Sequence, residues 1–228
     1  MNDKELVANA AVEHVTQRDN ITVGLGTGST ANFFIDGLAK KIKKESLDIK
    51  VVASSTISNI RAAEVGLVCI SLDQIDKIDY YVDGADEITL NDPIEVLKGR
   101  GYDLIKEKLL ASSSRECIII GDNSKIVKKI GVNFPIPIEV SPIAWKITKK
   151  IVEEYALKCD LRKNTADDGY AISSYGNFIL DCNCEYSDIS SLSKKLSEVP
   201  GVLEHGIFLN IVNTAIIANN GEIKKYEF

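Results

Sequence analysis

The sequence lacks any apolar stretch long enough to cross a membrane. No run approaches the roughly 20 apolar residues of a transmembrane helix, and the start, residues 1–5, has no apolar region of the kind found in signal peptides. Basic charge is also sparse, with 27 Lys and Arg against 33 Asp and Glu, a net charge of -6 and no basic stripe interleaved with aromatics. We therefore expect a cytoplasmic protein whose partners include neither a membrane nor a nucleic acid.

Histidine and cysteine, which dominate transition-metal sites, are scarce. His14 and His205 lie in different predicted elements without ligand spacing. The cysteines are odd in number, and three lie in apolar runs where a small hydrophobic residue would serve, so free buried thiols are expected. They are Cys69, Cys117, Cys159, Cys182 and Cys184. Cys182-Asn183-Cys184 has no second matching pair and no nearby histidine. We therefore expect no metal and no cofactor.

Short apolar runs alternate with segments of helical periodicity, and 228 residues allow one substantial core with a smaller satellite. The predicted strands are residues 21–25, 49–53, 67–70, 80–82 and 117–120. The predicted helices are residues 4–17, 30–44, 56–64 and 103–113. This alternation predicts an α/β fold with a Rossmann-like, mostly parallel sheet and helices on both faces. Such a sheet binds ligands at the carboxyl ends of its strands.

The pattern changes near Gly131. Residues 134–142 hold three of the five prolines and cannot be helical. A helix at 143–155, strands at 158–162, 170–174 and 178–181, and a helix at 189–198 follow. Residues 207–212 and 215–218 can then return to the first sheet, before a turn at 219–221. We predict a Rossmann-like catalytic domain from residues 1–130 and 207–228, and a smaller α+β domain from residues 131–206.

A glycine-rich segment follows the first predicted strand and opens a helix. Gly26 and Gly28 let the backbone approach an anion, and the amides and hydroxyls of residues 27–30 can cradle a phosphate at the helix N-terminus. The same spacing also satisfies a dinucleotide-binding fingerprint. A dinucleotide site needs an acid at the end of the second strand, but the chain has Ser54-Ser55-Thr56 there, which suits a phosphate or a small sugar better.

Charged residues follow the fourth predicted strand. Asp83 and Asp86 lie at the sheet edge where ligands bind, whereas a structural turn is the preferred interpretation of Glu87. Lys98 can project as a cation from a short glycine loop. Glu107 lies beside the apolar stripe of the next helix, where partial burial is expected to raise its pKa toward that of a useful base. On the residues alone, a solvated ion pair is the favoured alternative for Lys98 and Glu107.

Taken in order, these motifs resemble A-type ribose-5-phosphate isomerase. The resemblance lies in residues 26–30, 54–56, 83–87, 98–99 and 107–108, then in residues 122–125, 134–140, 176–181 and 200–202, nearly the whole chain. It implies that ribose 5-phosphate and ribulose 5-phosphate are interconverted through an enediolate, in the non-oxidative branch of the pentose phosphate pathway. It also implies a homodimer or homotetramer.

The resemblance assigns roles to individual residues. Glu107 would move the proton between C2 and C1, and Lys98 would stabilise the developing negative oxygen. Asp83 would assist ring opening and proton traffic, while Asp86 would bind hydroxyls. The residues implied to bind substrate or its phosphate are Gly26, Thr27, Gly28, Ser29, Thr30, Ser55, Gly99 and Lys125.

Five positions depart from the family pattern. Arg100, Tyr102 and Asp103 bring bulk and charge to a loop that is small in the family. Val7 stands where many members have a lysine near the phosphate, and Tyr175 stands where an asparagine is usual. We expect these changes to affect substrate affinity and substrate identity more than the fold.

Two other functions remain open at this level. A non-catalytic sugar-phosphate sensor, or a diverged paralogue acting on another sugar phosphate, would use the same cradle. Asp83, Asp86, Lys98 and Glu107 together favour an enzyme, because a sensor needs no proton-transfer base. A nicotinamide-dependent oxidoreductase is disfavoured by residues 54–56.

Overall fold

The computed structural model describes residues 2–228, which form two compact units. The first comprises the chain up to Ala85, Lys106–Ile126 and Asn210–Phe228, and the second comprises Asp86–Ile105 and Val127–Leu209. This division differs from the predicted domains mainly in residues 86–105, which lie in the second unit. Within the described part of the chain, no helix has both the length and the apolar character needed to cross a membrane.

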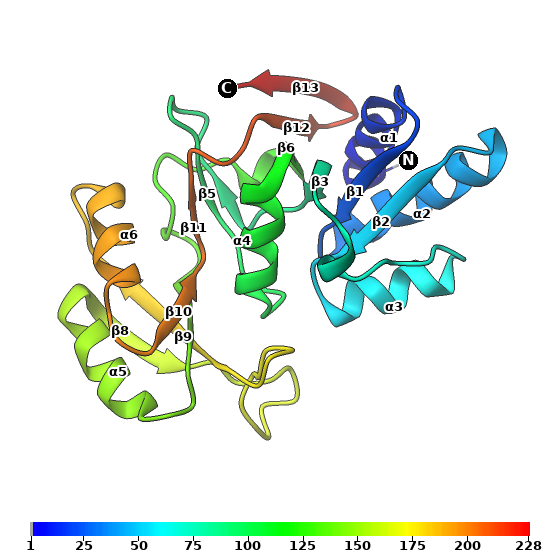
Figure 1. Ribbon diagram of the computed structural model, residues 1–228. Coiled ribbons are helices and arrows are strands. Elements are labelled where there is room, and N and C mark those ends of the chain that lie inside the picture. The colour runs from blue at the N-terminus through cyan, green and yellow to red at the C-terminus, as the bar shows by residue number, and fades with distance from the viewer. Residues whose placement is uncertain (1) are drawn as a thin grey trace. The chain divides into compact units, whose positions relative to one another are not determined.

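The first unit is built on a six-stranded sheet in the order β13-β12-β6-β3-β1-β2 (Figure 1). Its strands are β1 (Ile21–Leu25), β2 (Ile49–Ala53), β3 (Ile78–Asp83), β6 (Ser114–Asp122), β12 (Thr214–Asn219) and β13 (Glu222–Glu227). All neighbouring strands are parallel except β12 and β13. The mostly parallel α/β sheet predicted from the sequence is therefore confirmed.

Helices and short 3-10 turns precede or follow these strands. They are α1 (Asp3–Val15), α2 (Ser29–Glu45), α3 (Thr56–Glu64), η1 (Leu72–Gln74), α4 (Leu104–Ser113) and η2 (Asn123–Lys125). Local sequence sets the ends of α3. Ser55 and Ser58 form a reciprocal capping box at its start, and Gly66, with φ of 83°, turns the chain just beyond its C-cap, Val65.

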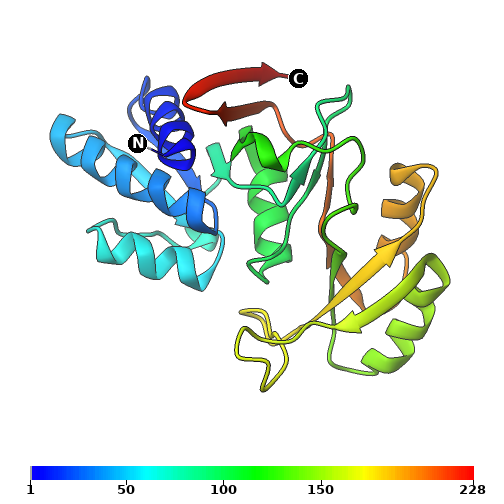
Figure 2. The same ribbon diagram turned by 180° about the vertical axis from the view of Figure 1, so that it is seen from behind.

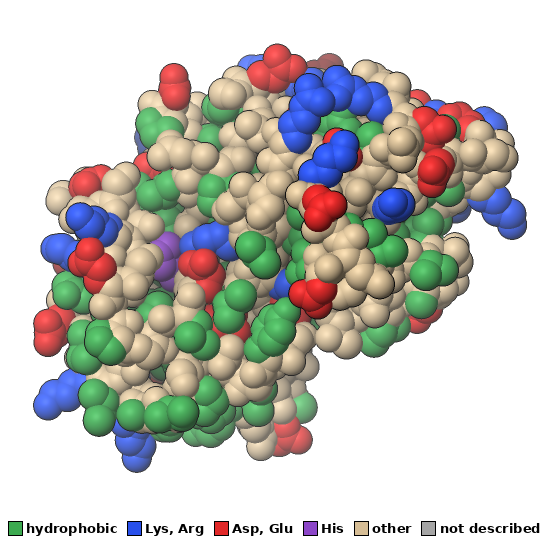
Figure 3. All heavy atoms as spheres, viewed as in Figure 1, with side chains coloured by type: hydrophobic (Ala, Val, Ile, Leu, Met, Phe, Trp, Pro, Cys, Tyr) green, Lys and Arg blue, Asp and Glu red, His purple; other side chains and the backbone are tan. Residues whose placement is uncertain are grey.

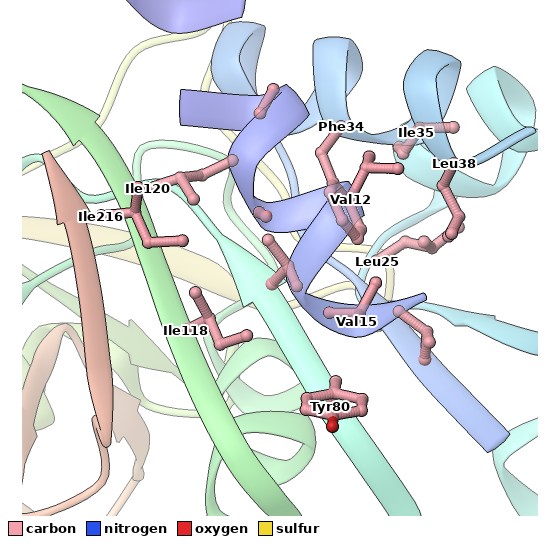
Figure 4. Packing of buried hydrophobic residues seen from close by; sticks show 14 of the residues in the cluster. Val12, Val15, Leu25, Phe34, Ile35, Leu38, Tyr80, Ile118, Ile120 and Ile216 are labelled. Carbon is pink, nitrogen blue, oxygen red and sulfur yellow. The ribbon is translucent and has the colours of Figure 1, made fainter. Parts of the chain in front are cut away.

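The main core of the first unit lies between the sheet and the helices α1 and α2, which lie side by side (Figure 2). Figure 4 shows Phe34 of α2 beside Val12 of α1, in one cluster with Val15, Tyr80 of β3 and Ile118 of β6. Residues of the opposite alternation phase, including Tyr81, Ile119 and Ile217, are buried as well. Because strand side chains alternate between faces, both faces of the sheet are covered.

The second unit contains two smaller antiparallel sheets. The four-stranded sheet has the order β10-β7-β9-β8 and the three-stranded sheet the order β11-β5-β4. Their strands are β4 (Glu87–Ile88), β5 (Glu95–Leu97), β7 (Ile136–Val140), β8 (Ala156–Leu161), β9 (Phe178–Cys184), β10 (Val202–His205) and β11 (Ile207–Leu209). The helical segments are α5 (Trp145–Val152), η3 (Glu153–Tyr155) and α6 (Ile189–Ser197). Val152 and Leu196 place α5 and α6 in one apolar cluster with the larger sheet.

Three predicted strands differ in the structure. Residues 67–70 contribute only a single bridge, from Cys69 to Val51, because the chain touches β2 at one point. Residues 170–174 form two isolated bridges rather than a strand. The prediction that residues 207–212 return to the first sheet is wrong, since β11 pairs with β5 in the second unit, and the chain rejoins the large sheet at β12.

The expectation of free thiols is wrong for two of the five cysteines. Cys159 and Cys182 lie directly opposite each other on β8 and β9 and form a disulfide. Cys69, Cys117 and Cys184 are not part of a disulfide. The pairing depends on the register of two strands, which cysteine spacing alone does not reveal.

Candidate active site

The predicted phosphate loop connects β1 to α2. Gly28, with φ of 122°, is the N-cap residue of α2, and Ser29 and Thr30 are the first two helical residues. Backbone amides at a helix start point outward without intrahelical partners and favour a bound anion. Gly26 has no room for a side chain, because an added Cβ would lie 2.2 Å from the carboxyl of Asp83. Two glycines thus allow the loop to pass this carboxylate and turn into the helix.

Thr27 connects this loop to its neighbours. Its hydroxyl lies 3.0 Å from Ser54 Oγ and donates to Ser55 Oγ at 2.7 Å, and its backbone N–H donates to Asp83 Oδ1 at 3.0 Å. The serines that argued against a dinucleotide site therefore support the phosphate loop directly. Ser55 is also the capping residue of α3, so its hydroxyl lies among backbone donors at the start of a second helix.

Asp83 is fully buried at the end of β3 and accepts several hydrogen bonds. Besides Thr27, the Gly84 N–H donates to Oδ1 at 2.7 Å and the Tyr81 hydroxyl donates to Oδ2 at 2.5 Å. Burial, the negative charges of Asp83 and Glu107 and the hydrogen bond to Asp83 raise the pKa of Tyr81 well above its usual range. The phenol is thus a proton donor that fixes the Asp83 carboxylate.

Glu107 lies in α4 with only 2% of its surface exposed. Its charge acts on Tyr81, which points away from the main core, and so it reaches the side of the sheet where Tyr81 holds Asp83. Partial burial of this carboxyl was the sequence expectation, and the structure buries it almost completely. The first unit therefore contains two buried acids, Asp83 and Glu107, whose charges both raise the pKa of Tyr81.

Lysines from two elements lie near the α2 start and the end of β6. Lys4 Nζ of α1 donates to Ser29 Oγ at 2.9 Å. Burial tends to raise the pKa of Asp122, but hydrogen bonds from Ser124 and the charges of Lys125 and Lys4 hold it below its usual value. Lys125 was anticipated from the sequence, whereas Lys4 was not. Only the packing of α1 beside α2 reveals that Lys4 reaches the loop.

Three other predicted site residues lie in the second unit. Lys98 follows β5, is 4% exposed, and its backbone N–H donates to the Gly206 carbonyl at 2.9 Å. Its ammonium lies 5.7 Å from the centre of the Phe208 ring. Gly99 has φ of 113°, and an added Cβ would lie 2.4 Å from Leu104. This position therefore requires glycine for both its backbone angle and its packing.

The two acids of the β4 segment have different surroundings. Asp86 is half-buried, and its backbone N–H donates to the Leu97 carbonyl at 2.9 Å. Glu87 is fully buried and accepts hydrogen bonds from the backbone N–H groups of Gly131, Asn133 and Phe134. Glu87 therefore anchors the segment before β7, although it does so from strand β4 and not from the expected turn, while Asp86 keeps an exposed fraction.

The residues that depart from the family pattern mostly have structural contacts. The Arg100 guanidinium lies 5.4 Å from the Phe134 ring centre. Tyr102 adopts a positive φ of 76°. Asp103 is buried and accepts hydrogen bonds from the Ser174 N–H and hydroxyl, each at 2.7 Å. The bulk and charge predicted for the sugar loop are thus held within the second unit, and Asp103 anchors the loop where α4 begins.

Both histidines have structural partners. His14 Nε2 lies 2.9 Å from Glu116, and its ring packs edge-on against Tyr80. His205 is buried, with Nε2 3.1 Å from the Ser197 hydroxyl. Over residues 2–228, no group of three or more His, Cys, Asp and Glu side chains has the arrangement of a metal site.

The predicted site residues are thus divided between the units. The first unit brings together the phosphate loop, Ser55 and Asp83, with Glu107 acting on the same tyrosine. The second unit holds Asp86, Lys98 and Gly99. The chain passes between the units four times, and two of these crossings, at residues 85–86 and 105–106, lie close in sequence to Asp86 and Glu107.

Comparisons with known proteins agree on one family. The model of the family described as ribose 5-phosphate isomerase A (phosphoriboisomerase A) matches residues 50–222. A ribose-5-phosphate isomerase A from Bacillus mycoides is 38% identical over 228 residues, covering 99% of this chain and all of the relative. A solved ribose 5-phosphate isomerase A from Methanocaldococcus jannaschii has 32% identity and a TM-score of 0.91, covering 99% of this chain and 98% of its own. A D-ribose-5-phosphate isomerase in complex with phospho-erythronic acid has 36% identity and a TM-score of 0.92, and both chains are covered completely.

Proposed function

Because the chain belongs to the ribose 5-phosphate isomerase A family, we propose that it interconverts D-ribose 5-phosphate and D-ribulose 5-phosphate. It is an aldose-ketose isomerase, and its place is the non-oxidative branch of the pentose phosphate pathway. The observation that carries the proposal is the cluster around Asp83. There a buried carboxylate is hydrogen-bonded to the phosphate-loop amide of Thr27, and a second buried carboxylate, Glu107, acts on the same tyrosine.

The reaction requires one hydrogen to move from C2 to C1 of the open-chain sugar. Glu107 takes the C2 proton, and the electrons of that bond shift toward the C1 carbonyl, whose oxygen becomes negative. Lys98 stabilises this oxygen in the enediolate. Asp83 assists ring opening and moves a proton between the sugar oxygens, while Asp86 binds hydroxyls. Protonated Glu107 then delivers its proton to C1, which leaves a carbonyl at C2 and restores the carboxylate.

The complex of a relative with phospho-erythronic acid supports this route. The carboxylate of phospho-erythronic acid is planar and spreads negative charge over two oxygens, as an enediolate does. It therefore stands in for the reacting end of the intermediate. Tight binding of such a species is expected of a site complementary to the transition state. We place the phosphate of the substrate at the loop formed by residues 26–30, because this loop opens α2 at Ser29 and a helix N-terminus favours an anion.

Incubation with D-ribose 5-phosphate tests the proposal. Ketose is expected to accumulate to an equilibrium mixture, with D-ribose, which lacks the phosphate, reacting far more slowly. The absorbance of added NADH is expected to stay constant. Absence of ketose formation would remove the isomerase assignment, and consumption of NADH would favour an oxidoreductase instead. A non-catalytic sensor is not favoured, because it needs the phosphate cradle but neither Glu107 nor Lys98.

Phosphate recognition is proposed for Gly26, Thr27, Gly28, Ser29, Thr30, Ser55 and Lys125, with Gly99 beside the sugar. To this set we add Lys4, since its ammonium contacts Ser29 at the helix start. Val7 points into the core, so the cation comes from one helical turn earlier in the same helix. The positive charge of Lys4 attracts the phosphate dianion, so α1 needs no further cation at position 7.

Replacing Ser29 and Thr30 together with alanine is expected to raise KM for ribose 5-phosphate by roughly ten-fold or more, since hydrogen bonds to a charged group are lost. Lys4→Met should raise KM in the same direction, and kcat should change little in both variants. Ser190→Ala, at an exposed hydroxyl of the second unit, is the control. Initial rates over a range of substrate concentrations give KM and kcat for each variant. Wild-type KM in the double variant would place the phosphate elsewhere.

We also propose that the chain acts in the cytoplasm as a homodimer or homotetramer. Apolar side chains gather along the margin of the second unit near α5 (Figure 3). Ile143, Ile147 and Leu157 are all largely exposed there, and such patches are commonly covered by another protein surface. We propose a second copy of the chain as this partner, as the resemblance to the family implies.

Light scattering is expected to give two or four times the chain mass of 25.0 kDa. Ile147→Asp should shift the protein toward the monomer, because a charge would be buried in the contact. Ile223→Asp changes an exposed apolar residue of β13 in the first unit and should leave the assembly intact. A monomeric wild-type protein would contradict the oligomer, and an unchanged mass for Ile147→Asp would place the contact elsewhere.

A further inference from the structure

Arg162 occupies an unusual position for a charged side chain. It follows β8, and its own backbone is fixed by hydrogen bonds to Ile179 and Ala171, at 2.8 and 2.9 Å. The residue is only 8% exposed. Arginine is rarely buried unless its charge and its five donors find partners, so the contacts of the guanidinium show what holds it in place.

The guanidinium is shared between an acid and a backbone carbonyl. Nε donates to Asp181 Oδ2 at 2.9 Å and Nη2 donates to Oδ1 at 2.5 Å, a two-pronged pair with a carboxylate on β9. Nη1 donates to the carbonyl of Gly99 at 2.7 Å. The Tyr102 ring centre lies 5.6 Å from the same guanidinium. The acid therefore orients the arginine, and the arginine holds the loop that follows β5.

The hydrogen bond to Gly99 acts on the segment that carries Lys98. On one side, the Lys98 N–H is bonded to the Gly206 carbonyl. On the other side, Gly99 adopts a positive φ. Its carbonyl accepts the hydrogen bond from Arg162, which holds the backbone in this conformation. The peptide group before Lys98 and the peptide group after Gly99 are thus both fixed by partners within the second unit. Since an ammonium on a four-carbon stem is flexible, a fixed backbone limits where it can reach.

We propose that Arg162 is a positioning residue for isomerisation, which acts through the Gly99 carbonyl to direct the Lys98 ammonium toward the oxygen that becomes negative. The inference rests on the proposed function, because it needs Lys98 to act on the substrate. Arg162 itself contacts no reacting atom. Asp181 belongs to the same device, since its carboxylate fixes the plane of the guanidinium and leaves Nη1 to bind the loop.

Arg162→Lys is the test variant. Lysine keeps the positive charge beside Asp181 but cannot form the two-pronged pair and hold the Gly99 carbonyl at once. The expected result is a loss of about ten-fold in kcat with KM nearly unchanged, since one hydrogen bond from a charged donor is removed. Val152→Ala, which removes buried volume from the same unit far from the loop in sequence, is the control for stability. It should lower the melting temperature and leave kcat near the wild-type value.

A double-mutant cycle with Lys98→Met separates positioning from a general structural effect. If Arg162 acts through Lys98, then Arg162→Lys should cost little further kcat once Lys98 is absent. Independent, multiplying losses would overturn the proposal, as would an unchanged kcat in Arg162→Lys. If Arg162→Lys does not fold, Asp181→Asn takes its place in the cycle, because it keeps arginine while weakening its orientation. A wild-type chain without isomerase activity would instead contradict the proposed function, so the two failures are distinguishable.

Discussion

Replacing Glu107 with glutamine is expected to lower kcat for D-ribose 5-phosphate by at least about a hundred-fold, the lower end of the usual contribution of general-base catalysis. Glutamine keeps the size and shape of a side chain that is 2% exposed. It removes the carboxylate that takes a proton from carbon. A neutral amide is too weak a base to take that proton. The measurement is the initial rate of ketose formation at saturating substrate.

KM should remain within about three-fold of wild type, because binding energy is provided mainly by the phosphate loop and not by the base. Glu64→Gln is the matched control. Glu64 lies on α3 of the same unit, and its exposed carboxylate is bonded to Arg61 at 3.0 Å. This control should keep the wild-type kcat. A Glu107→Gln protein with kcat within about ten-fold of wild type would show that another group removes the proton.

Lys98→Met is expected to lower kcat by about a hundred- to a thousand-fold, as observed when one preorganised donor to a developing oxyanion is removed. Methionine retains an apolar stem where lysine lies 4% exposed beside Phe208, so the packing is largely kept. The positive charge that stabilises the enediolate oxygen is lost. Steady-state kinetics measure the effect, and circular dichroism checks that the variant is folded.

The control is Lys128→Met, at an exposed lysine of the same unit, which removes one charge without changing a buried site. It should leave kcat unchanged. An equal loss in the two variants would mean that net charge rather than position matters. A Lys98→Met variant with the wild-type kcat would show that Lys98 takes no part in the reaction. The proposed role of Arg162 in positioning Lys98 would then fail as well.

The first unit was largely predictable because its signals are local. The apolar runs at 21–25 and 49–53 are the strands β1 and β2 to the residue. Likewise, α3 begins after the Ser55 cap and ends before Gly66, as expected from the sequence. Helix caps, glycines and continuous buried runs act within a few residues, so their consequences can be predicted from a short window.

The second unit was less predictable because its sheets depend on distant partners. The β4 and β5 strands are two and three residues long, and β5 pairs with β11 more than a hundred residues later. No short window contains such a pairing. The Cys159–Cys182 disulfide depends in the same way on the register of β8 against β9.

The candidate site shows the same difference between local and distant contacts. The sequence placed the glycine-rich loop and Asp83 at the ends of their strands, because each follows from its own element. The solvated ion pair favoured on the residues alone for Lys98 and Glu107 is wrong, since both side chains are buried. The sequence did not predict the contact of Lys4 with Ser29, which depends on how α1 packs beside α2. Nor did it single out Arg162, whose partners lie 19 and 63 positions away in the sequence.

The central claim is that the chain moves hydrogen between C2 and C1 of ribose 5-phosphate, and nuclear magnetic resonance in deuterium oxide tests it most directly. The wild-type protein is expected to form ketose from which the C2 hydrogen has been removed, with deuterium appearing in part at C1, because the proton held by Glu107 exchanges with solvent. Glu107→Gln should show neither change at a comparable rate. If the wild-type protein, at a concentration equal to that of the substrate, leaves the C2 hydrogen in place and forms no ketose, the account is wrong.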